Sequence, residues 1–428
     1  MKIMVIGGGG REHAIIKKLK ENPAAEIIYA LPGNGGIAAD AVCVDVKATD
    51  IDGIVAFVRG TKIDYAVVAP DDPLVLGCVD ALEAEGIPCF GPRANAAIIE
   101  GSKVFSKDLM KKYGIPTAAY EVFSDPKEAL AYLETAPIPT VVKADGLALG
   151  KGVTVAMTRE EACGAVREIM EDKKFGRSGD QIVIEEYLEG PEVSVLAFTD
   201  GTTVKPMVSS MDHKRVGDGD VGPNTGGMGT IAPNPCYTPD VAERCMNEIF
   251  LPTIRAMNLE GCPFKGCLYF GLMVTKDGPK VIEYNCRFGD PETQVVLPLL
   301  KSDLLTIMLA VENETLADTP VEFSDGAACC VMLASGGYPG KYEKGKAIDL
   351  GEAEAMAQVY HSGTALDDDD NLVTAGGRVL GISCTAGDLP TAVEKAYAAA
   401  EQVKWDGMIM RRDIGKRALG ILAESDHT

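Results

Sequence analysis

The first ninety residues alternate short apolar segments with amphipathic segments of helical spacing, and this alternation constrains the fold more than any other feature. The apolar segments are residues 3–6, 26–30, 65–69 and 87–90. The amphipathic segments between them are residues 11–20, 50–59 and 73–85. Strands that alternate with helices form a parallel sheet covered by helices. We therefore predict an N-terminal α/β domain whose first element is a strand.

Beyond this region the pattern changes. A charged helical segment at residues 102–113 ends at Gly114, and we place a domain boundary near it. The next helices are expected at residues 160–171 and 389–402. Further strands are expected at residues 140–144, 181–186, 192–199, 267–275, 280–288, 329–333 and 378–383. The strands between residues 192 and 288 suggest an antiparallel or mixed sheet that carries a long Gly- and Asp-rich loop.

The acidic composition excludes several classes of partner. A formal net charge of −22 repels phosphate backbones, so we expect neither nucleic acid nor an anionic membrane as a partner. An anionic substrate would need a local basic pocket. The apolar runs are far shorter than the roughly 20 residues that cross a bilayer. Twelve cysteines without a C-x-x-C pair indicate reduced thiols in a cytoplasmic protein rather than disulfides or a zinc site.

Two glycine-rich segments resemble nucleotide motifs but fail the test of spacing. In GGGGREHA, the G-x-G-x-x-G pattern requires glycine where Glu12 or His13 stands, which argues against a dinucleotide site. An anion near Arg11 and a simple tight turn both remain open. In DGLALGKG, Gly146 and Gly150 are one residue too close for a P-loop. This segment is either a phosphate-covering loop or a hairpin turn.

The strand at residues 280–288 carries the most informative pattern. Because alternate side chains point to opposite faces, Glu283, Asn285 and Arg287 share one face. The other face, expected to be buried, holds Ile282, Tyr284, Cys286 and Phe288. A carboxylate beside an amide oxygen suits Mg²⁺, and a neighbouring guanidinium suits a carboxylate substrate. A solvated strand face with a Glu–Arg pair is the alternative.

Two further polar segments are candidates for a functional site. FGDPETQ follows it directly and adds Asp290 and Glu292. The second is residues 212–229, rich in glycine, acids and bases. Long loops of this kind are usually functional or disordered, and we interpret this one as a binding loop without secondary structure. Its His213 is a candidate acid or base, although a lone histidine is more often only a hydrogen-bonding partner. The run at residues 367–370 is expected to be a solvated turn.

The ordered set of motifs resembles the ATP-grasp superfamily, and within it the phosphoribosylamine–glycine ligase family. The motifs are GGGGREHA from Gly7, KADGLALGKGV from Lys143, EEYLEGPEVS from Glu185, the loop at residues 212–229, EYNCRFGDPETQ from Glu283, ASGGYPG from Ala334, GGRVLG from Gly376 and RRDIG from Arg411. The resemblance implies a multidomain α/β fold with four parts. These are an N-terminal parallel-sheet pre-ATP-grasp domain (1–102), the two parts of an ATP-grasp module (103–190 and 191–325) and a small C-terminal α+β domain (326–428).

The resemblance also implies an activity. ATP would phosphorylate the carboxylate of glycine, and the nitrogen of 5-phosphoribosylamine would displace phosphate, giving glycinamide ribonucleotide for purine synthesis. The implied cofactors are ATP and Mg²⁺, with Mn²⁺ as an alternative, and the implied state is a cytoplasmic monomer. Two other readings stay open. A carboxylase of the same superfamily would be stimulated by bicarbonate, and a regulatory protein would bind Mg-ATP without turnover.

Site residues are carried over from the matching motifs. Those expected at ATP are Lys103, Lys143, Gly146, Gly150, Lys151, Gly152, Glu185, Glu186, Leu188 and Glu192. Those expected at the metal are Glu283 and Asn285. Catalytic roles are implied for Arg287, Asp212, His213, Lys214 and Asp290. Substrate contacts are implied for Gly9, Arg11, Glu12, Asp71, Asn224, Thr225, Gly226 and Gly227.

Three positions depart from the family pattern. Pro191 stands where the family has a glutamate, so only Glu192 is left for the ribose. Asp71 stands in APDDPL where the family shows G-P-E-x-P-L. The strand at residues 268–274 offers no acid, so the metal is expected to have two protein ligands.

Overall fold

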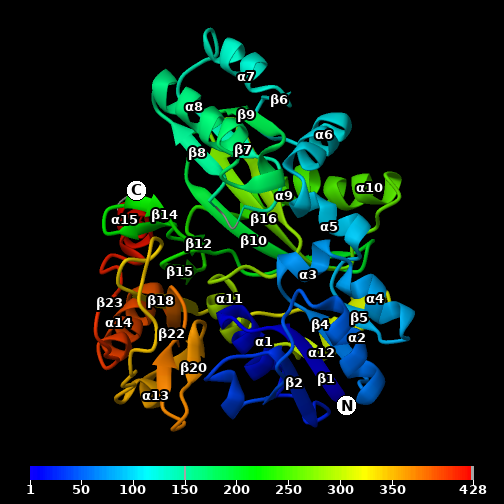
Figure 1. The fold of residues 1–428 in the computed structure, drawn as a ribbon, viewed down its shortest axis with the longest axis vertical. Helices are drawn as coiled ribbons and strands as arrows, with labels where there is room; N and C mark the ends of the chain where they lie inside the picture. The colour runs from blue at the N-terminus through cyan, green and yellow to red at the C-terminus, as the bar shows by residue number, and fades with distance from the viewer. Residues whose placement is uncertain (149–150, 426–428) are drawn as a thin grey trace.

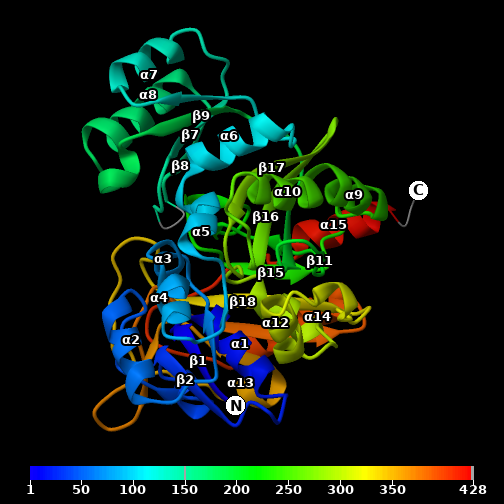
Figure 2. The ribbon, with the colours of Figure 1, turned by 90° about the vertical axis from the view of Figure 1, so that its right-hand side faces the viewer.

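The computed structural model describes residues 1–148 and 151–425, which form four larger sheets with their covering helices. The sheet of β6–β9 stands at one end of the molecule and the N-terminal sheet at the opposite end, as both views show (Figures 1 and 2). The C-terminal domain lies beside the N-terminal domain (Figure 1). Within the described residues, no helix combines the length and apolar character needed to span a membrane.

The N-terminal domain contains a parallel sheet in the order β3-β2-β1-β4-β5. Its strands are β1 (Lys2–Gly7), β2 (Ile27–Pro32), β3 (Val42–Cys43), β4 (Tyr65–Val68) and β5 (Cys89–Phe90). Its helices are α1 (Gly10–Leu19), α2 (Ile51–Gly60), α3 (Asp71–Val75) and α4 (Cys78–Ala84). The single helix predicted at residues 73–85 is wrong. Gly77 adopts a φ of +86°, which ends one helix before the next begins.

The second part contains an antiparallel sheet in the order β6-β9-β7-β8. Its strands are β6 (Tyr120–Phe123), β7 (Thr140–Ala144), β8 (Val153–Ala156) and β9 (Ile182–Glu186). Its helices, with the two that lead into it, are α5 (Ala94–Gly101), α6 (Lys103–Tyr113), α7 (Pro126–Leu133) and α8 (Arg159–Val166). The buried core of this sheet draws only on residues between Ala129 and Ile184. The sheet with α7 and α8 is therefore packed as a separate unit, whereas residues of α5 and α6 belong to a core shared with the N-terminal sheet.

The next sheet is also antiparallel, in the order β11-β10-β16-β17. It consists of β10 (Glu192–Thr199), β11 (Val204–Pro206), β16 (Gly266–Thr275) and β17 (Gly278–Asn285). The helical segments that follow β15 are α9 (Pro239–Cys245), η4 (Met246–Phe250) and α10 (Leu251–Leu259). Residues of this sheet share one buried core with Met4 and Ile6 of β1. This sheet is thus packed firmly onto the N-terminal domain.

The C-terminal sheet has the order β12-β15-β18-β22-β19, with β23 beside β18. Its strands are β12 (Met211–Asp212), β15 (Gly229–Ala232), β18 (Ala327–Ser335), β19 (Gln358–His361), β22 (Arg378–Ala386) and β23 (Met408–Ile409). The nearby helices are α11 (Thr293–Leu299), α12 (Leu304–Glu312), α14 (Leu389–Ala400) and α15 (Lys416–Ser425). The run at residues 367–370 is an exposed turn between β20 (Thr364–Leu366) and β21 (Leu372–Thr374), as predicted.

The segment at residues 212–229 differs from its prediction. It is a β-hairpin of β13 (Arg215–Gly217) and β14 (Val221–Asn224). Its two ends belong to β12 and β15, so it projects from the C-terminal sheet and not from the sheet of β10 and β16. The glycines that suggested an irregular loop include Gly219 and Gly222, which have φ values of +70° and +83° in and beside the turn. They permit the hairpin's tight geometry.

Candidate active site

The side chains of Glu283, Asn285 and Arg287 lie along the end of β17 and the residue pair that follows it. Tyr284, Cys286 and Phe288 are buried, as the alternation predicted. Ile282 is only half-buried, which corrects its expected place in the core. A register shift pairs Gly271 with Glu283 but the next residue, Leu272, with Val281, so the bulge at Ile282 interrupts the alternation. Val281 is buried instead.

A cluster of cations surrounds Glu283. The Nζ atom of Lys214 lies 3.7 Å from its carboxylate and 3.3 Å from that of Glu192. Burial opposes ionisation of Glu283, but Lys214, Lys143, Lys103 and Arg287 hold its pKa below the ordinary value. Glu192, in turn, is the main cause that raises the pKa of Lys214. The acidic chain therefore contains the local basic site that an anionic substrate requires.

Lys143 and Lys103 meet at the base of the glycine-rich segment. Lys143 donates a hydrogen bond of 3.0 Å to the carbonyl of Ile282, which the bulge presents. Lys103 donates to the carbonyl of Gly146 at 3.1 Å. Asp145 accepts from the hydroxyl of Ser102 and the backbone N–H of Val104. The start of the segment is thus fixed to the N-terminus of α6, next to both lysines.

The far end of the glycine-rich segment leads into β8, which begins at Val153. Lys151 is exposed and Gly152 is buried, with its carbonyl bonded to the N–H of Ala144. Gly150 lies outside the described residues. A role of this segment over the phosphates of ATP remains a prediction.

The residues expected at the adenine and ribose lie on β9, β10 and the link between them. Glu185 is buried, and its carboxylate lies 3.1 Å from Lys143 and 3.4 Å from Lys107. Burial lowers the pKa of Lys107 to about 8. Two lysines lie at its carboxylate, and a role of Glu185 at the ATP stays a prediction. Exposed Glu186 and half-buried Leu188 remain candidates for that role.

Arg287 is held by two carboxylates from the N-terminal part of the chain. Its Nη2 atom lies 2.9 Å from Glu100 and 3.9 Å from Asp71. Burial opposes ionisation of Asp71, but Arg287 and Arg11 lower its pKa. The Nε atom of Arg287 is buried and has no hydrogen-bond partner among the described residues. The site therefore contains one buried donor that no described residue satisfies.

Arg11 and Glu12 bring the first glycine-rich segment to the same place. Glu12 accepts from the N–H of Gly9 at 2.7 Å and from Arg11 at 2.8 Å. Arg11 donates through Nη1 to the carbonyl of Phe288 and through its backbone N–H to Asp290. Asp290 also lies 3.6 Å from Arg378. Burial opposes ionisation of Asp290, but Arg378 and Arg11 lower its pKa.

The hairpin at residues 212–229 contacts this group from the C-terminal side. Thr225 bonds to the carbonyl of Lys214 and to the N–H of Gly227, while half-buried Asn224 pairs with Arg215. Burial and the nearby Glu292 raise the pKa of Asp212 well above its ordinary value. Because the charges of Asp212 and Glu292 repel each other, ionisation of one disfavours ionisation of the other.

His213 is not free for proton transfer, which corrects its assignment as a catalytic residue. Its ring is buried, with Nδ1 bonded to the carbonyl of Gly229 at 3.0 Å. Its Nε2 accepts from the backbone N–H of Gly415 at 3.2 Å. Burial lowers the pKa of His213 to about 4. We interpret it as a neutral link between the hairpin and the segment RRDIG.

Three residues of the site escaped sequence reasoning. Glu100 of α5 bonds to the end of β17, and Arg378 donates to the carbonyls of Asp290 and Gly227. The hydroxyl of Tyr338 accepts from the N–H of Gly226 at 3.0 Å. Arg378 and Tyr338 lie in the motifs GGRVLG and ASGGYPG, which could have suggested them. Glu100 gave no signal except that it is the one charged residue of α5.

The oxygen donors at β17 fit a divalent cation that takes most ligands from elsewhere. The described residues contain no group of three or more His, Cys, Asp or Glu side chains that could hold a metal. Glu283 and Asn285 supply one carboxylate and one amide oxygen on the same strand face. Mg²⁺ commonly binds through one or two protein oxygens together with waters and substrate phosphates, so this donor set suits a metal–nucleotide complex.

Comparison with known families decides what kind of protein carries this site. Models of the phosphoribosylglycinamide synthetase N domain, ATP-grasp (A) domain and C domain match residues 1–100, 101–293 and 328–417 in succession. The chain belongs to the phosphoribosylglycinamide synthetase family. The resemblance read from the motifs and the expected multidomain α/β class are thereby confirmed. Our division at residues 102, 190 and 325 stays a prediction.

Two relatives named phosphoribosylamine–glycine ligase match over nearly their whole length. The chain is 49% identical to the phosphoribosylamine–glycine ligase of Rhizobium meliloti, covering 98% of this chain and 99% of the relative. A crystal structure of the Thermotoga maritima phosphoribosylamine–glycine ligase superposes with a TM-score of 0.85 at 35% identity, covering 97% and 100% of the two chains. The biotin carboxylase domain of Hydrogenobacter thermophilus 2-oxoglutarate carboxylase superposes with a TM-score of 0.72 at 16% identity, covering 95% and 91%. That last likeness concerns the fold alone.

Proposed function

We propose that this chain joins glycine to 5-phosphoribosylamine, with conversion of ATP to ADP and phosphate, and so forms glycinamide ribonucleotide in purine biosynthesis. The observation that carries the proposal is the continuous family match across all three domains, with relatives named for this reaction. The basic cluster around Glu283 supports it, since ATP and phosphoribosylamine are both anionic.

In the first step, a carboxylate oxygen of glycine attacks the γ-phosphorus of ATP, and ADP leaves with the electron pair of the broken P–O bond. Lys143 and Lys103 would neutralise the phosphates, and the Arg287 guanidinium would orient the glycine carboxylate; the charges that both lysines and Arg287 exert on Glu283 support this. Glu283 and Asn285 would hold Mg²⁺ or Mn²⁺, which would neutralise charge on the transferring phosphoryl group. Phosphoryl transfer depends mainly on such positioning and neutralisation.

In the second step, the amine of phosphoribosylamine attacks the carbonyl carbon of glycyl phosphate. Phosphate leaves with the oxygen that came from glycine, and the nitrogen of the new amide loses a proton. The carboxyls of Asp212 and Glu292 are our candidates to accept it, because burial raises the pKa of both groups and a carboxylate of raised pKa takes a proton more readily. We propose that this step takes place among residues contributed by two domains: Arg11, Asp71, Asp290 and the turn at residues 224–227.

The assay for the proposed function is ADP formation by the purified chain with ATP, Mg²⁺, glycine and freshly generated phosphoribosylamine. Rapid turnover only when all four are present supports the proposal. Turnover stimulated instead by bicarbonate would favour a carboxylase, and binding of Mg-ATP without turnover would favour a regulatory protein. Either result would overturn the assignment.

We place the reaction in the cytoplasm and expect a monomer. All twelve cysteines are free thiols, which suits a reducing compartment. Light scattering of the purified chain tests the expected monomer.

A further inference from the structure

Glu100, the penultimate residue of α5, binds three consecutive residues at the end of the active-site strand. Its Oε1 atom accepts from Nδ2 of Asn285 and from Nη2 of Arg287, both at 2.9 Å. Its Oε2 atom accepts from the backbone N–H of Cys286 at 2.7 Å. The side chain is only 5% exposed. A single buried carboxylate therefore satisfies donors on both sides of a buried core residue.

The bond to Asn285 fixes which end of the amide points to the metal position. An asparagine side chain carries an NH₂ donor at one end and a carbonyl acceptor at the other. Because Glu100 takes the NH₂ group, the carbonyl oxygen of Asn285 is turned away from α5. Only this oxygen can bind a cation. Without Glu100, a half-turn about the terminal torsion would present the NH₂ group instead.

The bond to Arg287 fixes the guanidinium that faces the substrate. Nη2 is held by Glu100, and Nη1 lies 3.4 Å from the carbonyl of Phe288. The plane of the guanidinium is therefore set, and Nε is the buried donor left without a partner among the described residues. Since the same Glu100 oxygen holds Asn285, the metal position and the carboxylate position are tied to one atom.

We propose that Glu100 is a positioning residue that aligns the metal-binding oxygen of Asn285 with the substrate-binding guanidinium of Arg287. The inference rests on the proposed function for the identity of the substrate, glycine. Its chemical basis is that partners of metal ligands orient those ligands, and their loss typically costs about 10- to 100-fold in metal affinity or activity. The residue itself touches neither metal nor substrate.

The test compares Glu100→Gln with wild type and with a control, Glu83→Gln. The control alters another Glu–Arg pair, in which Glu83 of α4 contacts Arg93, the residue before α5. Mn²⁺ binding is followed by electron paramagnetic resonance in the presence of a non-hydrolysable ATP analogue. We expect Glu100→Gln to weaken Mn²⁺ binding roughly 10- to 100-fold and to raise KM for glycine. KM for phosphoribosylamine should not change, and the control should match wild type in every measurement.

A merely structural role would lower the melting temperature and alter the KM values of both substrates together. Unchanged Mn²⁺ binding and unchanged KM for glycine in a folded Glu100→Gln variant would overturn the proposal. If that variant does not fold, Glu100→Asp, which keeps the charge but shortens the side chain, must show the same selective loss, and its absence refutes the idea. If wild type lacks ligase activity, the proposed function fails, while the Mn²⁺ measurement still decides the role of Glu100.

Discussion

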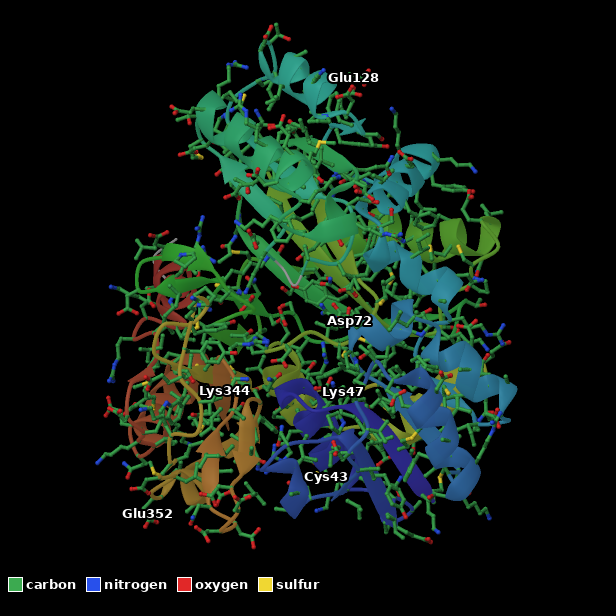
Figure 3. The ribbon with its side chains drawn as sticks, viewed as in Figure 1. Cys43, Lys47, Asp72, Glu128, Lys344 and Glu352 are labelled. Atoms are coloured by element: carbon green, nitrogen blue, oxygen red, sulfur yellow. The ribbon has the colours of Figure 1, made fainter. Side chains whose placement is uncertain are left out.

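Replacing Asn285 by alanine removes one amide oxygen from the proposed metal position and one hydrogen bond from Glu100, and these two losses should have very different effects. The site of this substitution is central: Arg287, two residues along from Asn285, lies near Asp71, and Figure 3 labels the adjacent Asp72 near the middle of the molecule. Asn285 is half-buried, and Glu100 keeps its bonds from Arg287 and Cys286 after the substitution.

The expected cost to stability follows from that remaining pairing. A hydrogen bond to a charged group contributes about 1.5–3 kcal/mol. Since Glu100 stays paired, we expect the lower end, about 1.5 kcal/mol. For activity, losing a direct metal ligand should cost at least as much as losing its supporting partner, whose effect reaches about 100-fold. A 100-fold fall in kcat/KM corresponds to about 2.7 kcal/mol of transition-state stabilisation.

The assay measures kcat/KM for Mg-ATP at several Mg²⁺ concentrations, together with the thermal unfolding curve. Asn22→Ala is a matched control, because Asn22 likewise donates to a carboxylate, that of Asp303, at 2.9 Å. The control should lose similar stability and keep full activity. An Asn285→Ala enzyme with wild-type kcat/KM at every Mg²⁺ concentration would refute the placement of this amide at the metal. Activity lost only in proportion to unfolded protein would refute it too.

Three further predictions follow from the contacts of the site. Lys143→Met should abolish measurable ADP formation and weaken ATP binding in calorimetry, whereas a wild-type ATP affinity would exclude this lysine from the phosphates. Arg378→Lys should raise KM for phosphoribosylamine more than KM for ATP in steady-state kinetics. The reason is that Arg378 donates hydrogen bonds to the carbonyls of Asp290 and Gly227. Equal changes in the two KM values would argue against this role. His213 has a folded pKa near 4, below the ordinary 6.5, so the unfolded chain binds its proton first as the pH falls. The stability it contributes is present above pH 6.5 and is lost between pH 6.5 and 4. In denaturant titrations across this window, the free energy of unfolding of His213→Gln should depend less on pH than that of wild type. The same pH dependence in both proteins would contradict the assignment of His213 as a neutral, buried side chain.

The sequence predicted well what depends on local alternation. The parallel N-terminal strands and the shared face of Glu283, Asn285 and Arg287 follow from periods of 3.6 and 2 that adjacent residues reveal. The bulge at Ile282 escaped this reasoning because it arises from pairing with β16, not from the strand's own pattern. It nevertheless matters, since it presents a carbonyl to Lys143.

What the sequence could not predict depends on partners far along the chain. His213 looked like a free acid or base until Gly415, 202 residues later, was found to occupy its second nitrogen. Glu100 meets Asn285 across 185 residues, and no periodicity links the two. The motif predicted Glu185 at the ATP, but it gave no sign of the two lysines at its carboxylate, which come from α6 and β7. Pairings of this kind are fixed only by the packing of whole domains.

The most direct test of the account follows an oxygen atom from glycine into phosphate. The chain would be incubated with ATP, Mg²⁺, phosphoribosylamine and glycine labelled with ¹⁸O in its carboxylate, and the released phosphate examined by ³¹P NMR. If glycine is activated as an acyl phosphate at the end of β17, each phosphate released in turnover carries a single oxygen from glycine. Product formation with unlabelled phosphate would contradict the acyl phosphate, and with it the roles proposed for Arg287, Glu283 and Asn285.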